Sequence, residues 1–118
     1  MAVANRKLDA PDETRKFDHG QLEVLKVGGF TFGRNTFELG WKWSESVKPI
    51  VKTESCQTHH AGYVLSGRLH VITDDGGESE LSAGEAYEVE PGHDAWVVGD
   101  EPVVSVELLG AEKYAKAQ

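Results

Sequence analysis

Three side chains that bind metals well lie close together in the middle of the chain. Cys56, His59 and His60 are followed by a short apolar stretch that stops at Gly67, and Glu54 adds a carboxylate two residues before the cysteine. Thiolate and imidazole are the protein donors best suited to borderline ions such as Zn²⁺. We therefore expect a metal site at the start of a strand.

A second stretch with a candidate ligand follows about one hairpin later. Residues 91–96 read Pro-Gly-His-Asp-Ala-Trp, and they place His93 directly after a Pro-Gly pair, which favours a turn. A single site built from both stretches requires them to meet in space. Whether they meet depends on the fold.

The elements that must position these residues are short strands. Aromatic and β-branched residues dominate 30–38, and Asp-Asp-Gly-Gly at 74–77 is a strong hairpin signal between two apolar runs. Turn signals recur roughly every eight to twelve residues, which is typical of an all-β sandwich or barrel. The expected strands cover residues 21–26, 30–38, 63–65, 68–73, 79–81, 86–90, 95–98 and 103–108.

The remaining segments frame one β-barrel domain at residues 21–110. Residues 1–20 are polar and are expected to form an arm or an extended strand laid over that domain. Residues 44–53 form a looser connection, and the Ala-, Lys- and Glu-rich residues 111–118 predict a short helical tail.

Composition and charge exclude several classes of function. The chain has 118 residues, enough for one domain, and a net charge of −8 with its basic residues scattered. Nucleic acid and anionic membranes are therefore not expected partners. One cysteine forms no internal disulfide. We found no apolar run of transmembrane length and no apolar signal segment at the N-terminus, so we expect a cytoplasmic location.

Around Cys56 the chain resembles the cupin family of small jelly-roll barrels. The first cupin motif has two histidines one residue apart, then three or four residues, a glutamate, six residues and a glycine. Counting back from Gly67 puts His60 at the glutamate position, Cys56 at the second histidine position and Glu54 at the first. The following residues 63–71 are very similar to the strand, glycine and strand of that motif.

The second cupin motif matches less closely. Its two glycines are Gly84 and Gly92, its proline position holds Glu90, and its final histidine position holds Ala95. His93 lies two residues earlier and would face the same side of an extended strand. The ordinary cupin ligand set of three histidines and a glutamate is therefore not intact, and His93 is the candidate replacement.

The resemblance implies a small molecule bound in the barrel and a divalent metal, Zn²⁺ or less favourably Fe²⁺, held by Glu54, Cys56, His60 and His93. A turn at 57–59 would be needed to let Cys56 and His60 face each other. If the chain is an enzyme, the resemblance implies a metal-dependent dioxygenase, isomerase or lyase. A metal-free binding or sensing protein and a structural interaction module remain open alternatives. Small cupins usually associate, so a homodimer is also implied.

Each of these residues also has an ordinary structural interpretation. Cys56 is compatible with a buried small hydrophobe, and His59 is expected at the surface. Trp43 and Trp96 are candidates for the wall of a ligand pocket or for the core. Arg34 either pairs with a ligand carboxylate in that pocket or faces outward from its strand. Cys56 and His60 would also suit a nucleophile and its base, but the sequence shows no third, orienting group.

Overall fold

Residues 2–116 form nine strands and two one-turn helices. The structure is a computed structural model that describes residues 2–116. The strands are β1 (Glu13–Phe17), β2 (Gly20–Val27), β3 (Phe30–Phe37), β4 (His60–Ser66), β5 (Arg68–Thr73), β6 (Glu78–Ser82), β7 (Ala86–Val89), β8 (His93–Val98) and β9 (Val103–Leu109). The helices are α1 (Trp43–Ser46) and α2 (Lys48–Val51).

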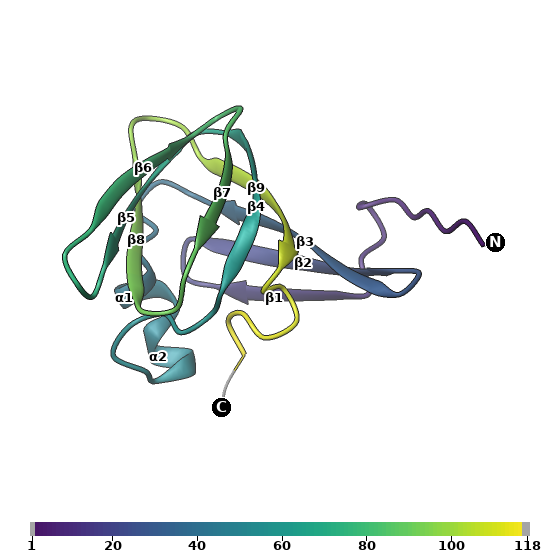
Figure 1. Ribbon diagram of the computed structural model, residues 1–118, viewed down its shortest axis with the longest axis horizontal. Helices are drawn as coiled ribbons and strands as arrows, with labels where there is room; N and C mark the ends of the chain where they lie inside the picture. Colours follow the sequence, from purple (N-terminus) through teal and green to yellow (C-terminus); the bar gives the residue numbers. More distant parts are fainter. Residues whose placement is uncertain (1, 117–118) are drawn as a thin grey trace.

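Two antiparallel sheets pack face to face into a barrel (Figure 1). One has the strand order β1-β2-β3-β9-β4-β7, and the other has the order β6-β5-β8. The last strand therefore lies between β3 and β4, as expected when a jelly roll winds back on itself. The predicted all-β jelly roll is confirmed. The buried core between the sheets includes Leu22, Val24, Phe37, Trp41, Trp43, Val47, Val71 and Val103.

Alternation along β9 decides which side chains enter the barrel. Val103, Ser105 and Glu107 are buried, whereas Val104 and Val106 between them are only half-buried. Because successive side chains of a strand point to opposite faces, the first three share the inner face. One of them is a carboxylate, and a buried carboxylate requires partners.

Residues 1–20 contain more regular structure than a polar arm requires. β1 pairs with β2 from Glu13 opposite Val24 to Phe17 opposite Gly20, and it forms one edge of the larger sheet. Residues 2–7 are exposed and project from the barrel beside the β2–β3 hairpin (Figure 1). The expected extended strand is therefore present, but only in the second half of the segment.

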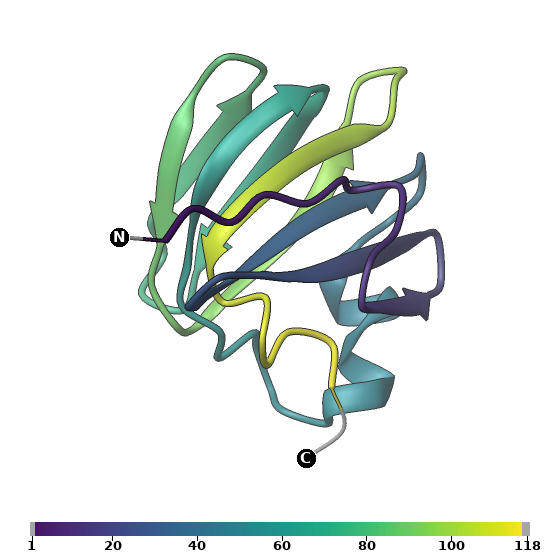
Figure 2. The same cartoon turned by 90° about the vertical axis from the view of Figure 1, so that its right-hand side faces the viewer.

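The predicted helical tail is wrong for residues 111–116, which form turns (residues 117–118 lie outside the described part). Arg15 explains the difference, because its guanidinium donates to the carbonyls of Ala111, Glu112 and Tyr114 at 2.8, 3.0 and 2.6 Å. A helix would use those carbonyls internally. In Figure 2 this C-terminal segment runs below the strands, at the same end of the barrel as α2.

Residues 44–53, expected as a loose connection, instead contain most of α1 and all of α2. Pro49 lies in the first turn of α2, where a missing N–H is tolerated. Within residues 2–116 no helix is long and apolar enough to cross a membrane.

Candidate metal centre

The two stretches that the sequence singled out meet inside the barrel. One donor atom each from Cys56, His60 and His93 lies within 4.8 Å of the other two, and all three side chains are buried. Cys56 Sγ is 3.6 Å from His60 Nε2, and the two imidazole rings are 5.2 Å apart. Residues 57–59 form an irregular segment and not the tight turn expected from the sequence, but Cys56 still faces the first residue of β4.

Backbone hydrogen bonds fix Cys56 against the start of β8. The amide of Cys56 donates to the carbonyl of His93 at 2.7 Å, and the amides of Gly92 and His93 donate to the carbonyl of Cys56 at 2.7 and 3.2 Å. Gly92 has φ of +94°, a conformation that few other residues adopt. The Pro-Gly turn thus sets the distance between thiol and imidazole.

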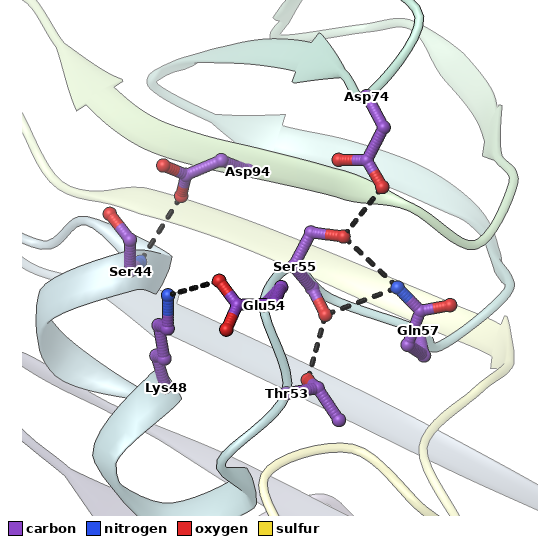
Figure 3. Close-up of polar contacts among 8 residues, drawn as sticks. All are labelled: Ser44, Lys48, Thr53, Glu54, Ser55, Gln57, Asp74 and Asp94. Carbon is purple, nitrogen blue, oxygen red and sulfur yellow. Dashed lines mark hydrogen bonds and ion pairs between the residues drawn. The ribbon is translucent and has the colours of Figure 1, made fainter.

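Side-chain hydrogen bonds brace the loop that carries the cysteine (Figure 3). Ser55 Oγ donates to Asp74 at 2.8 Å, Gln57 Nε2 donates to Ser55 Oγ at 3.0 Å, and Thr53 donates to the Ser55 carbonyl at 2.7 Å. Asp74 belongs to the β5–β6 turn, so the loop is tied to the smaller sheet. Such support holds a site in one geometry.

Both imidazoles use their Nδ1 atoms for hydrogen bonds and keep Nε2 for the site. His60 Nδ1 is 2.9 Å from Glu107 Oε1, and Tyr87 donates to Glu107 Oε2 at 2.7 Å. His93 Nδ1 is 2.8 Å from the carbonyl of Glu90. A carbonyl only accepts, so His93 carries a proton on Nδ1, and Nε2 is the atom that a metal ion would use.

The charges of the site favour a thiolate beside an imidazolium. Burial raises the pKa of the Cys56 thiol, but hydrogen bonds to His60 and His93 outweigh burial and bring it below its ordinary value. Burial lowers the pKa of His60, while the Glu107 charge and hydrogen bonds to Cys56 and Glu107 raise it above its ordinary value. Burial and the Glu107 charge raise the pKa of Tyr87, which stays a neutral donor.

A cavity of about 40 Å³ lies beside the two histidines. Its size corresponds to roughly three water-sized positions. Aromatic side chains fill much of the barrel, and Trp41, Trp43 and Tyr114 contribute to the cavity wall. This cavity therefore accommodates a ligand of a few atoms, far below the roughly 300 Å³ of a typical drug-sized pocket.

The other predicted site residues lie in different places. Trp43 lines the cavity. The Glu54 side chain is fully exposed and pairs with Lys48 at 3.5 Å. Arg34 pairs with Glu23 across β2 and β3, away from the cavity lining. The Trp96 ring lies 4.8 Å from His70, with Lys42 Nζ 5.2 Å from its centre, and it is not among the cavity-lining residues.

Three residues near the site were not selected from the sequence. Glu107 lies four residues after Val103 on a predicted strand, so the two side chains face the same side of the sheet. The alternation of buried and exposed positions could therefore have selected Glu107. Tyr87 lies on a strand where burial alternates only weakly. Tyr114 comes from the tail, 5.3 Å from the His60 ring, and no local pattern indicates that contact.

The donor set fits a structural or catalytic zinc-type ion. Two imidazoles and one thiolate are typical ligands for Zn²⁺, and three protein ligands leave a fourth position open. The partners of the two Nδ1 atoms match the carboxylate and carbonyl groups that commonly orient metal-bound histidines. Within the described residues, this is the one cluster of at least three such donors.

Solved structures share the fold at low sequence identity. A protein of unknown function from Rhizobium leguminosarum has a TM-score of 0.64 at 17% identity, over 92% of this chain and 98% of that chain. AerE from Microcystis aeruginosa has 0.61 at 18%, over 92% of this chain and 46% of AerE. Oxalate decarboxylase from Bacillus subtilis has 0.57 at 22%, over 87% of this chain and 28% of that chain.

These likenesses concern the fold alone, since one fold carries many chemistries. A comparison with protein-family models and with curated proteins gave no match. The chain thus has a cupin-like barrel, as its two motifs predicted, with a Cys/His/His cluster inside it.

Proposed function

We propose that this protein holds a divalent metal ion through Cys56, His60 and His93 and binds a small molecule at the ion's open position. The observation that carries the proposal is the convergence of three buried donor atoms within 4.8 Å of one another. Both Nδ1 atoms are occupied by hydrogen bonds to Glu107 and to the Glu90 carbonyl. An ion shared by the three donors would leave these hydrogen bonds in place and replace the contact between Cys56 and His60.

Zinc is the ion that the donor set favours, because thiolate is a softer ligand than the carboxylates and histidines of iron sites. When bound, such an ion supplies Lewis acidity or an activated water. Glu107 would keep the His60 proton on Nδ1 and leave Nε2 for the metal. Trp43 and Tyr114 would keep bulk water away from the site.

Metal analysis of purified protein and of matched variants tests the proposal. We expect about one equivalent of zinc in the wild type and less than about a tenth in Cys56→Ser, His60→Ala and His93→Ala. His59→Ala is the control, because His59 is adjacent to His60 but is exposed and paired with Glu88. Glu54→Ala is a second control. Stoichiometric metal in His60→Ala would contradict the proposal.

A metal-free function is the second candidate, and Glu107 favours it. Glu107 would supply the orienting third group that the sequence did not show for a Cys–His nucleophile. Cys56 Sγ lies 3.6 Å from His60 Nε2, and His60 Nδ1 lies 2.9 Å from Glu107 Oε1. In this arrangement the Cys56 thiolate would form a carbon–sulfur bond with an alkylating reagent such as iodoacetamide as the carbon–iodine bond breaks and iodide leaves. His60 would hold the proton of the thiol, and Glu107 would orient His60. Metal-free protein whose Cys56 reacts with a small electrophile at neutral pH, and loses that reactivity in Glu107→Gln, would support it.

We also propose that two copies associate and that the protein acts in the cytoplasm. Tyr63 and Leu65 on β4 and Leu108 on the neighbouring β9 are large apolar side chains, each more than 40% exposed. Such a patch favours association. A cytoplasmic location keeps the thiol of Cys56 reduced for its proposed role. Sedimentation measurements with Leu65→Lys test the dimer, which this variant would convert to a monomer.

A further inference from the structure

The barrel has one side where its two sheets meet without strand pairing. β6 and β7 follow one another in the chain, but β6 is an edge of the smaller sheet and β7 is an edge of the larger one (Figure 1). In the described part of the chain, neither of these edges pairs with a further strand. The other edge of the smaller sheet is covered, because Lys42 and Cys56 form bridges with Trp96 and His93 of β8.

A surface groove of about 500 Å³ follows the line between β6 and β7. Residues 77–81 and 85–90 supply most of its walls, and we call it the seam groove. Four side chains line both the seam groove and the interior cavity beside the histidines, namely Val71, Leu81, Tyr87 and Val89. A wall of single side chains therefore separates the two spaces.

This wall is the thinnest cover of the interior cavity. All of its four side chains except Val71 are half-buried, so they meet solvent as well as the cavity. Tyr87 spans the wall, since it lines the seam groove and its hydroxyl donates to Glu107 in the cavity at 2.7 Å. At the tail end of the barrel, the cavity is instead closed by Trp43 and Tyr114, which are only 2% and 3% exposed.

The seam groove is strongly acidic. Among residues 2–116, no lysine, arginine or histidine lines it, whereas five glutamates do: Glu78, Glu80, Glu85, Glu88 and Glu90. Three of the five pair with His70, Arg68 or His59, which lie outside the lining. Behind the wall, the buried Glu107 continues the negative charge into the cavity. Such a charged groove raises the local concentration of cations and speeds their arrival.

The groove on the tail side of the cluster has the opposite charge balance. Cys56 lines that groove, together with Lys113 and Lys116 and a single carboxylate, from Glu112. A cation is therefore favoured on the seam side of the three donors and not on the tail side.

We propose that a divalent cation enters the protein through the seam groove and passes Leu81 and Tyr87 to reach Cys56, His60 and His93. The two wall side chains form a gate that opens when β6 and β7 separate. Each of these strands pairs on one side only, and local opening of such an edge needs less free energy than unfolding of the sheet. This inference rests on the proposed metal site and adds the route to it.

Leu81→Ala tests the gate through the rate of metal uptake. Metal-free protein is mixed rapidly with Co²⁺, whose absorption on binding thiolate reports its arrival at Cys56. We expect the association and dissociation rate constants to rise together by about tenfold, with the dissociation constant unchanged. Leu69→Ala is the matched control, because Leu69 pairs with Leu81 and lines the cavity but not the seam groove. Equal acceleration in both variants, or none in Leu81→Ala, would overturn the gate.

A second pair of variants tests the charge at exposed positions, where folding is not at risk. Glu80→Gln/Glu90→Gln should slow Co²⁺ association about threefold or more at low salt, and the difference should vanish at about 1 M salt. Asp100→Asn/Glu101→Gln removes the same charge from the exposed β8–β9 turn and should have a much smaller effect. The same slowing in both double variants would contradict steering by the seam groove.

The rival route is tested by Arg15→Met, which frees the tail carbonyls that Arg15 holds. Faster Co²⁺ uptake in this variant, with a wild-type rate in Leu81→Ala, would place the route at the tail and overturn the proposal. Stoichiometric uptake at rates that no seam variant changes would overturn the route and leave the metal centre standing. No uptake at equilibrium would overturn both.

Discussion

His60 Nδ1 lies 2.9 Å from Glu107 Oε1, and both side chains are buried. The contact joins the first residue of β4 to an inward position of β9, two strands that pair in the larger sheet. Its effect is to fix which nitrogen of His60 faces Cys56. The site is therefore oriented by a residue outside both motifs that identify it in the sequence.

Glu107→Gln tests the orienting contact. We expect it to weaken zinc binding about 10- to 100-fold, as found when the carboxylate behind a metal-bound histidine is lost. Competition with a chromophoric chelator at pH 9 measures the effect where protons compete least for His60. Glu88→Gln is the control, because Glu88 makes a similar 2.8 Å contact to the exposed His59. Equal losses in both variants would mean that the contact does not orient the site.

The affinity for zinc should keep rising above pH 7. The raised pKa of His60 means that the metal-free protein holds a proton there beyond the ordinary range of histidine, and binding must displace it. The lowered pKa of Cys56 means that its proton is already lost and adds no further slope. We expect about a tenfold gain per pH unit between pH 7 and 9, from dissociation constants measured at each pH. A flat profile would contradict this charge arrangement.

Tyr87→Phe tests the stability that the polar network contributes. Tyr87 donates to Glu107 at 2.7 Å, and hydrogen bonds to a charged group contribute about 1.5–3 kcal/mol. We expect the free energy of unfolding in urea to fall by about that amount. Tyr63→Phe, at a position 43% exposed on β4, should change it by less than about 0.5 kcal/mol. Equally small losses of unfolding free energy in both variants would contradict this prediction, because they would mean that water already solvates the Glu107 carboxylate.

Arg15→Met tests how the tail closes the barrel. The Arg15 guanidinium holds three carbonyls of residues 111–114, and Tyr114 and Ala111 line the same surface groove as Cys56. Losing these bonds should raise the rate of Cys56 alkylation about tenfold or more, because the segment opens more often. Arg68→Met, which removes an exposed ion pair with Glu80, is the control. A wild-type rate in Arg15→Met would show that other contacts keep Cys56 covered.

The sequence predicts the barrel well because its strands and turns are local signals. The first motif also selects Cys56 and His60, and His93 lies two residues before the final histidine position of the second; the structure brings these three residues together. Counting along the first motif selects Glu54 as well, but the chain around Cys56 leaves the strand geometry that such counting assumes. Turned out of the barrel, the Glu54 carboxylate lies in solvent beside Lys48.

Residues that depend on long-range contacts escape local patterns. Arg15 reaches the carbonyl of Ala111 across 96 positions of sequence, so the tail looks helical until β1 is placed beside it. Asn35 and Trp41 resemble ordinary strand and core residues, and only the packing shows that Asn35 Oδ1 and Trp41 Nε1 have no partner within residues 2–116. Such features follow from tertiary structure and not from propensity.

X-ray absorption at the zinc edge tests the metal centre most directly. Protein loaded with one equivalent of Zn²⁺ should show one sulfur at about 2.3 Å and two imidazole nitrogens at about 2.0–2.1 Å, with a lighter atom in the fourth position. Any zinc that Cys56→Ser retains should lack the sulfur scatterer. A shell of nitrogen and oxygen alone in the wild type would contradict the account.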